Sequence, residues 1–396
     1  MPSWTWKLVS VRRQEVKSQM VVRGRLRILS LAILTAILLP CSHPRASGQS
    51  SEAHSTLFGF TPFPYDYSLE ALETVRRVTV PNSSLYAIHL DNGIPWKEML
   101  ADDPLPPQIA SEWANIVKRI GAKQKVYVAI APLDMDRKSL SPATIGNGKL
   151  PLPEQLKSAS LDDPAVCRAY LAYVRFAVIR FHPQYLNIGI EAGEIMSRDF
   201  SRWPKFVQLY RFVYTHLKSE FPVMQIGISF GLGELRSARE AAGAKQILDS
   251  CDYVGLSFYP YASAFDEKFG APPYSGRAPW KEPLDWIRKY TNKPIAICET
   301  GYTTSNIDLP QYGLKLTGSA AEQAEYVDYL FKTARRDRYL FVVWYLAIDY
   351  DKLYDKLPGG SDVMKLWKNI GLMDGETHPK PAWDVWVRGV KGTRQQ

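Results

Sequence analysis

The stretch Lys293-Pro-Ile-Ala-Ile-Cys-Glu-Thr-Gly301 is a short apolar run that ends in an acidic residue. Its core, Pro294–Glu299, does not alternate between polar and apolar side chains. That pattern is typical of a strand buried on both faces, which occurs almost only in parallel sheets covered by helices. The acid at its end therefore lies where the strand leaves the core.

Similar apolar runs recur along the chain and alternate with segments that have apolar residues three and four positions apart, the helical spacing. The other predicted strands are Leu57–Thr61, Leu85–His89, Lys125–Ala131, Tyr185–Glu191, Met224–Phe230, Tyr253–Tyr259 and Leu340–Leu346. The predicted helices are Ser68–Arg77, Ile109–Ile120, Pro164–Arg180, Phe206–Glu220, Leu284–Tyr290 and Ala320–Arg336.

Repeated strand–helix units predict an α/β protein, and eight of them predict a single (β/α)₈ TIM barrel. The alternative is an open doubly wound sheet. Such a sheet usually has a glycine-rich turn after its first strand, and Phe58-Gly-Phe-Thr-Pro62 is not such a turn. The segments Leu133–Leu161, Pro260–Lys281 and Asp349–Leu357 are long and each follows a predicted strand. We expect them to wall a cleft at the C-terminal mouth of the barrel, where TIM-barrel active sites lie.

The N-terminal segment has the pattern of a secretory signal. Basic residues up to Arg27 precede the apolar run Ile28–Leu39, and small residues follow at Ala46–Gly48. We therefore divide the chain into a signal peptide and N-terminal extension at 1–48 and a catalytic domain at 49–396, and we expect a secreted or periplasmic protein. The alternative is an uncleaved membrane anchor, for which the run is short.

Net charge and cysteine content indicate which classes of partner and cofactor to expect. The formal net charge is +9, but most of the excess lies in residues 1–48, so the barrel is close to neutral and nucleic acid is not an expected partner. Cys167, Cys251 and Cys298 are too few for a disulfide framework and are expected to be buried thiols. No phosphate-binding loop or zinc spacing is found, so we expect neither a cofactor nor a metal, and we expect a monomer. The acids Asp349, Asp351 and Asp355 are interleaved with Lys352 and Lys356, which favours a solvated charged loop over a calcium site.

Two predicted strands end in glutamates, Glu191 and Glu299. Barrel closure brings the fourth and seventh strands to facing parts of one rim. Two carboxyl groups across a cleft are what hydrolysis of a glycosidic bond needs, one to protonate the leaving oxygen and one to meet the positive charge at the anomeric carbon. The alternative is that each glutamate only caps a strand or pairs with a loop lysine. Glu194 is an alternative acid.

These segments resemble those of clan A glycoside hydrolases, whose acid/base glutamate ends strand four and whose nucleophile ends strand seven. Glu299-Thr-Gly-Tyr302 resembles the nucleophile segment, and Asp252-Tyr-Val-Gly-Leu-Ser-Phe-Tyr-Pro-Tyr261 is similar to strand six of glycoside hydrolase family 53, the endo-β-1,4-galactanases. Residues 371–383 resemble the closing segment of many clan members. The resemblance implies that Glu191 is the acid/base, that Glu299 is the nucleophile, and that Tyr259 hydrogen-bonds Glu299.

One position departs from the clan pattern. The clan usually has asparagine before the acid/base, where it binds the sugar 2-hydroxyl, and this chain has Ile190. Three explanations are open: another contact, from Asn187 or Glu194; a substrate without that interaction; or a barrel that has lost activity.

Further substrate-binding candidates are His89, Asp91 and Trp96 after the second strand and Trp344 in the eighth, because sugars need hydrogen bonds and stack on rings. The alternatives are a polar turn and buried core tryptophans. The sequence thus predicts an exported, retaining glycoside hydrolase for a polysaccharide or oligosaccharide, and the resemblance points to a β-galactan as a candidate substrate. A non-catalytic carbohydrate-binding barrel is the competing hypothesis.

Overall fold

The computed structural model describes residues 55–394, apart from 147, 275, 311–312 and 357–363. Eight parallel strands close into a barrel in the order β1-β12-β9-β8-β7-β6-β3-β2, which confirms the predicted (β/α)₈ fold. The strands are β1 (Leu57–Phe60), β2 (Leu85–Leu90), β3 (Lys125–Ile130), β6 (Tyr185–Asn187), β7 (Gln225–Gly231), β8 (Tyr253–Phe258), β9 (Ile295–Thr300) and β12 (Phe341–Trp344).

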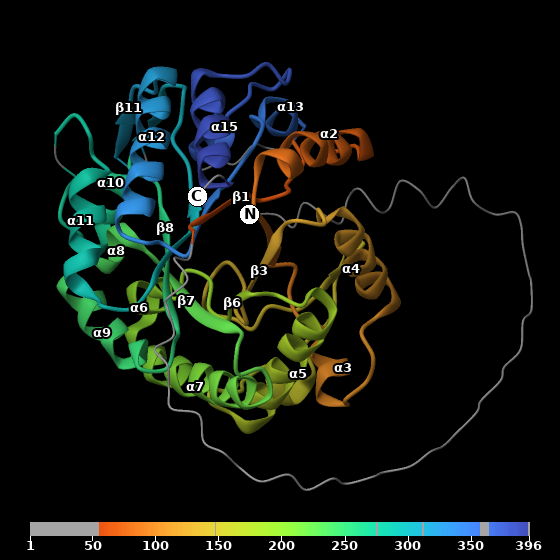
Figure 1. The fold of residues 1–396 in the computed structure, drawn as a ribbon. Helices are drawn as coiled ribbons and strands as arrows, with labels where there is room; N and C mark the ends of the chain where they lie inside the picture. The colour runs from red at the N-terminus through yellow and green to blue at the C-terminus, as the bar shows by residue number, and fades with distance from the viewer. Residues whose placement is uncertain (1–54, 147, 275, 311–312, 357–363, 395–396) are drawn as a thin grey trace, which may run out of the picture.

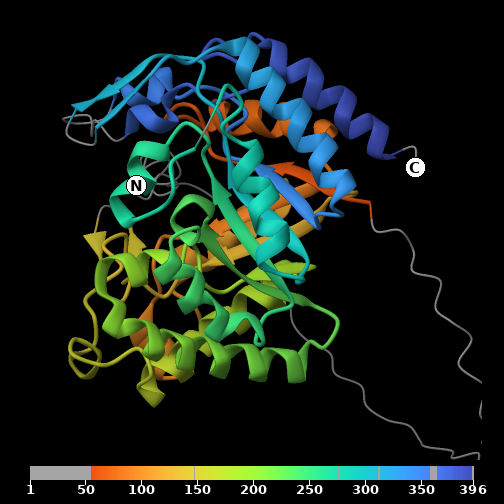
Figure 2. The ribbon, with the colours of Figure 1, turned by 90° about the vertical axis from the view of Figure 1, so that its left-hand side faces the viewer.

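Helices surround these strands (Figure 1). They are α2 (Leu69–Thr79), α4 (Pro107–Arg119), α5 (Pro164–Phe181), α7 (Trp203–Glu220), α9 (Ala238–Leu248), α11 (Lys281–Tyr290), α12 (Ala320–Arg336) and α15 (Pro381–Arg394). Helices α9 and α15 were not predicted from the sequence. Figure 2 shows α12 and α15 side by side on the outside of the barrel.

Local sequence explains where several helices begin. Ser68 accepts a hydrogen bond from the backbone N–H of Ala71 at the start of α2, and Asp163 does the same for Ala165 at the start of α5. Such caps satisfy N–H groups that have no partner inside the helix. Pro164 follows as the first residue of α5, where its missing N–H costs nothing.

The barrel interior is filled by an aromatic layer made of Tyr127, Tyr185, Tyr253 and Phe341. The ring of Phe341 lies 4.7 Å from that of Tyr127 and 5.0 Å from that of Tyr185, between centroids. Gly227 makes room for this layer, because a Cβ there would lie 2.4 Å from the Tyr253 ring. The layer closes the barrel below its C-terminal end.

Strand β9 contains an irregularity that decides which way its last residues point. On the β8 side its register passes from Ile297 directly to Glu299, and on the β12 side it passes from Ile297 to Thr300. One extra residue on one strand is a β-bulge, which changes the side chain's direction. As a result Cys298 packs in the buried cluster inside the barrel, while Thr300 points outward to the hydroxyl of Tyr326 on α12. Glu299 between them is placed at the mouth.

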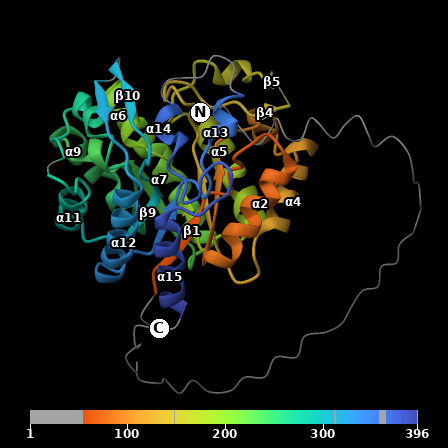
Figure 3. The same cartoon turned by 90° about the horizontal axis from the view of Figure 1, so that it is seen from above.

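Additional short elements lie at one end of the barrel, away from the C-terminus (Figure 3). They are the hairpin β4 (Thr144–Ile145) and β5 (Gly148–Lys149), the hairpin β10 (Ile307–Leu309) and β11 (Leu314–Leu316), and the helices α13 (Asp351–Tyr354) and α14 (Lys365–Lys368). The segment 133–161 was expected at the mouth, but the β10–β11 hairpin was not.

Asp349 corrects the expectation of a solvated loop. It is buried, accepts a hydrogen bond from the backbone N–H of Gly371, and forms a salt bridge with Lys380, whose Nζ lies 2.6 Å from Oδ2. Burial raises the pKa of Asp349 to about 6, although Lys380 opposes this. The pair fastens the C-terminal segment to the end of β12.

Other expectations concern the remaining parts of the chain. Cys167, Cys251 and Cys298 are unpaired and buried, as predicted. The predicted signal peptide at 1–48 lies outside the described residues. Among the residues that are described, no helix combines the length and hydropathy needed to cross a membrane.

Candidate active site

Glu299 lies at the mouth of the barrel, at the bulge of β9, and its side chain is almost fully buried. The hydroxyl of Tyr259, one residue past β8, donates a hydrogen bond to its Oε1. Burial raises the pKa of Glu299 to about 8, and the charge of Glu191 adds to the rise, whereas the Tyr259 hydrogen bond lowers it. The tyrosine therefore stabilises the ionised form of a carboxyl group that its surroundings tend to keep protonated.

Glu191 reaches the same region from a turn rather than from a strand. Strand β6 ends at Asn187, so the predicted strand Tyr185–Glu191 is too long. The backbone of Glu191 has φ 46°, an unusual value for a residue with a side chain, and its N–H donates to Ser229 Oγ at 3.0 Å. Ser229, on β7, also accepts a hydrogen bond from Asn187 at 2.9 Å. Asn187 thus supports the turn that carries Glu191.

The two glutamates lie close together, because Glu191 hydrogen-bonds Ser257, the β8 residue that pairs with Glu299 on β9. Burial and the charge of Glu194 raise the pKa of Glu191, whereas Arg137 and a hydrogen bond with Ser257 lower it. Because Glu191 and Glu299 each disfavour ionisation of the other, the pair holds a proton at higher pH than isolated carboxyl groups would. A proton on one carboxyl and a charge on the other is the arrangement that acid/base chemistry on a glycoside requires.

Arg137 joins Glu191 to Glu194. It comes from the segment after β3, and its side chain is 7% exposed. Its Nε lies 2.9 Å from Glu194 Oε2 and its Nη2 lies 3.4 Å from Glu191 Oε2. Glu194 also pairs with Arg198, one turn along its own helix, at 3.2 Å. Glu194, the alternative acid, is thus bound to two guanidinium groups and Glu191 to one.

His89 and Asp91 both belong to this end of the barrel. The ring of His89 makes edge contacts with Tyr127 and with Phe63, and burial lowers the pKa of His89 to about 4, so the imidazole is neutral. Its Nε2 has no hydrogen-bond partner among the described residues. Asp91 is exposed, and its charge raises the pKa of Glu299. Of the two, only Asp91 acts electrostatically on Glu299.

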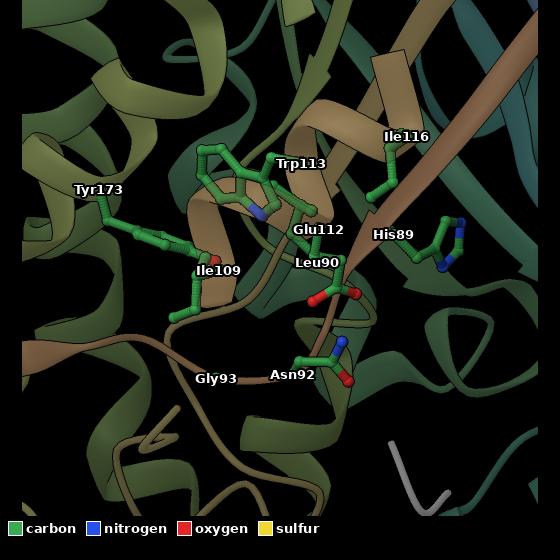
Figure 4. Close-up of a pocket in the computed structure, with 9 residues that line it drawn as sticks. All are labelled: His89, Leu90, Asn92, Gly93, Ile109, Glu112, Trp113, Ile116 and Tyr173. Atoms are coloured by element: carbon green, nitrogen blue, oxygen red, sulfur yellow. The ribbon is translucent and has the colours of Figure 1, made fainter. Parts of the chain in front are cut away.

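A small cavity of about 30 Å³ lies behind β2, which is room for about one water molecule. Figure 4 shows its lining, with Trp113 and Tyr173 on one side and the imidazole of His89 turned away from them. Its size excludes a sugar, so we assign it no role in binding.

The structure does not bring the two predicted tryptophans to the mouth. Trp96 is buried, and its indole N–H donates to the backbone oxygen of Ser141 at 2.8 Å. Trp344 is completely buried, donates to the backbone oxygen of Ile370 at 2.9 Å, and packs against Trp386 of α15. Both occupy the core positions that were the alternative interpretation.

Two aromatic residues that the sequence did not single out, Tyr345 and Trp367, lie next to Tyr259. Tyr345 lies 5.6 Å from Phe63 and 6.4 Å from Tyr259 between ring centroids, and burial raises its pKa, with the charge of Glu299 adding to the rise. Trp367, on α14, lies 6.1 Å from the ring of Tyr259. Side-chain alternation along β12 could have predicted the position of Tyr345. Phe341 and Val343 both point into the barrel, and the next residue on the same face is Tyr345.

The structure shows whether Ile190 or Asn187 can make the sugar contact of the asparagine that usually precedes the acid/base glutamate in the clan. Ile190 is half-buried, and its side chain packs against the buried cluster inside the barrel. Asn187 is fully buried, and its amide group is engaged by Tyr127, Ser229 and the backbone N–H of Gly189. Neither residue can replace the clan's contact with a sugar hydroxyl in this arrangement. Within the described part of the chain, no cluster of three or more His, Cys, Asp or Glu side chains could hold a metal ion.

Comparison with known proteins agrees with the fold. No protein-family model matches the chain, and no curated protein matches it in sequence. Among solved structures it is similar to an exo-β-1,4-mannosidase from Opitutaceae bacterium strain TAV5, with TM-score 0.59, 14% identity and 87% of this chain covered. The match spans 61% of that longer chain.

Two further similar structures are GH5_18 enzymes. One, from Streptomyces cattleya in complex with GlcNAc, has TM-score 0.60 and 13% identity, and the match covers 87% of this chain and 82% of that one. The other, a variant from Bifidobacterium longum subsp. longum in complex with Manβ1-4GlcNAc, has TM-score 0.56 and 12% identity, with 86% and 78% covered. At such low identity these matches establish the barrel fold and not a shared activity.

Proposed function

We propose that the chain is a retaining glycoside hydrolase in which Glu191 is the acid/base and Glu299 the nucleophile. The observation that carries the proposal is the pair of carboxyl groups at the barrel mouth, with Glu191 beside Arg137 and with Tyr259 donating to the almost fully buried Glu299. In the productive state the shared proton resides on Glu191 and is donated to the leaving oxygen. Glu299, whose ionised form Tyr259 stabilises, attacks the anomeric carbon once the proton is on Glu191, and Glu191 then activates the water that releases the sugar.

The decisive experiment combines a substrate screen with two variants. The panel contains β-galactan, β-1,4-linked mannan, Manβ1-4GlcNAc and aryl β-glycosides, because the sequence resemblance favours galactan and the similar structures carry mannose-related names. Glu299→Gln should abolish turnover of whichever substrate is cut. Glu191→Ala should regain turnover of an activated aryl glycoside when azide is added, and a β-glycosyl azide would demonstrate retention. An α-glycosyl azide would contradict it.

A carbohydrate-binding barrel without catalysis is the second candidate, and Ile190 favours it because the usual hydroxyl contact is missing. Calorimetric titration of the same oligosaccharides separates the two. An enzyme binds them in the Glu299→Gln form and turns them over in the native form, whereas a binding protein binds them in both and cuts none.

We further propose that the chain is exported and acts as a monomer. The basic and apolar pattern of residues 1–48 supports export. Sequencing the N-terminus of protein recovered from outside the cytoplasm tests it, since processing near Gly48 is expected. Light scattering of the processed protein tests the monomer.

A further inference from the structure

The segment from Arg137 to Glu194 contains charged contacts that the proposed reaction does not itself use. Arg137 is buried, has φ 54°, and its backbone oxygen accepts a hydrogen bond from Arg202 at 2.7 Å. A buried guanidinium in a strained backbone conformation is held by its surroundings rather than free to search for partners. Its direction is therefore fixed, and it points between two carboxylates.

The contacts of Arg137 with these two carboxylates are unequal. Nε lies 2.9 Å from Glu194, a hydrogen-bonded ion pair, whereas Nη2 lies 3.4 Å from Glu191, a longer and weaker contact. Arg198 adds a second positive charge on the side of Glu194. The positive charge nearest to Glu191 is thus mainly neutralised by Glu194.

We propose that Glu194 and Arg137 are positioning residues for Glu191, in which Glu194 holds the guanidinium back so that Glu191 can carry the proton it donates. This inference rests on the proposed function and adds the means by which the acid is kept protonated. A guanidinium fully paired with Glu191 would favour the carboxylate form and disable it as an acid. Arg137 at a longer distance still fixes the orientation of Glu191 without forcing it into the carboxylate form.

Other charged and titratable groups also act on Glu191. They are Glu194 and Arg198 on α6 (Gly193–Asp199), Glu299 on β9, Glu234 on α8 (Leu232–Leu235), Asp266 on α10 (Ser263–Asp266) and Tyr345 after β12. The acids among them, when ionised, repel a charge on Glu191. Arg137 and Arg198 are cations that lower the pKa of Glu191. The pairing of Arg137 with Glu194 therefore decides how strongly positive charge acts on Glu191.

The test is a titration of Glu191 itself, which needs no substrate. Full-length protein labelled with ¹³C at the glutamate carboxyl carbon is titrated by NMR, and Glu191→Gln identifies the signal. In Glu194→Gln the guanidinium loses the charge that neutralises it and acts on Glu191 without compensation, so the midpoint should fall by about one pH unit. In Arg137→Met it should rise by about the same amount. Glu220→Gln, which breaks an exposed ion pair with Arg175 on the outer helices, is the matched control and should leave it unchanged.

Opposite shifts support the proposal, because a merely structural role would move both variants in one direction or neither. Shifts of the same sign, or shifts no larger than that of Glu220→Gln, overturn it. Should Arg137→Met fail to fold, Glu194→Gln decides alone, since the amide is close in shape to the carboxylate. A protein that cuts no glycoside would refute the proposed function while leaving this titration fully interpretable. With an active substrate, the alkaline limb of kcat/KM should follow the NMR midpoints.

Discussion

Glu299→Gln should make the folded protein more stable at neutral pH, even though it removes a residue proposed to be catalytic. The Glu299 side chain is buried, and its pKa lies at about 8 in the folded state against 4.5 for a free glutamate. Between these two values the folded state keeps a proton that the unfolded state has released. Stability therefore falls as pH rises through this window, by about 1.4 kcal/mol per pH unit, and the loss is complete above pH 8.

The magnitude follows from the width of the window. At pH 7 the wild-type protein has lost about 3 kcal/mol through Glu299, an upper value because the proton is shared with Glu191. Glutamine does not ionise and can still accept the hydrogen bond from Tyr259. Glu299→Gln should thus gain up to about 3 kcal/mol at pH 7 and less than about 1 kcal/mol at pH 5.

Urea unfolding of both proteins at pH 5, 6, 7 and 8 measures this difference. The gain should grow with pH and level off near pH 8, while Glu220→Gln, at an exposed position, should show no such trend. A Glu299→Gln variant equal to or less stable than wild type at pH 7 would refute the reasoning, because the carboxyl group would then not be held protonated by its surroundings.

Three further predictions concern positions around the site. Ser229→Ala removes the acceptor of the Glu191 N–H, so unfolding free energy should drop by about 1–3 kcal/mol, and turnover should fall more than binding. Ile190→Asn, which restores the clan residue, should lower rather than raise activity and cost about 1–3 kcal/mol in denaturation, since it places an amide where a half-buried apolar side chain packs against the inner cluster; a gain in kcat would contradict this placement. Lys380→Met leaves Asp349 buried and unpaired, so calorimetry should show a loss of about 3–5 kcal/mol, smaller at pH 5 where that carboxyl is protonated.

The fold could be predicted because buried parallel strands leave a direct trace in the sequence. The continuous apolar runs and the helical periodicity set the order of elements, and α12 was predicted with the bounds Ala320–Arg336 that the structure has. Helix α9 was missed: its sequence, Ala-Arg-Glu-Ala-Ala-Gly-Ala-Lys-Gln-Ile-Leu, offers few large apolar residues to mark a buried face. Strand β6 was overestimated because Gly189-Ile190 continues the apolar run after the regular strand has ended.

The site could be predicted only in part, since side-chain direction depends on details that the residue order does not carry. Trp344 attracted attention as a large aromatic residue, but alternation along β12 turns it outward and brings Tyr345 to the mouth. In β9, by contrast, strict alternation would have given the wrong direction. Cys298 points into the barrel, so Glu299 would have pointed outward, and the β-bulge places it at the mouth instead. Arg137 comes from an irregular segment without periodicity, so only the folded chain shows that it lies beside Glu191.

The aromatic layer formed by Tyr127, Tyr185, Tyr253 and Phe341 has a consequence for the order of events at the site. With the barrel closed below, a ligand has no second exit and must leave by the opening through which it entered. The fragment released first must clear that opening before water can reach the carboxyl pair. In the proposed reaction, departure of the released fragment through this opening would then limit the rate whenever the fragment is long. Shorter substrates would turn over faster.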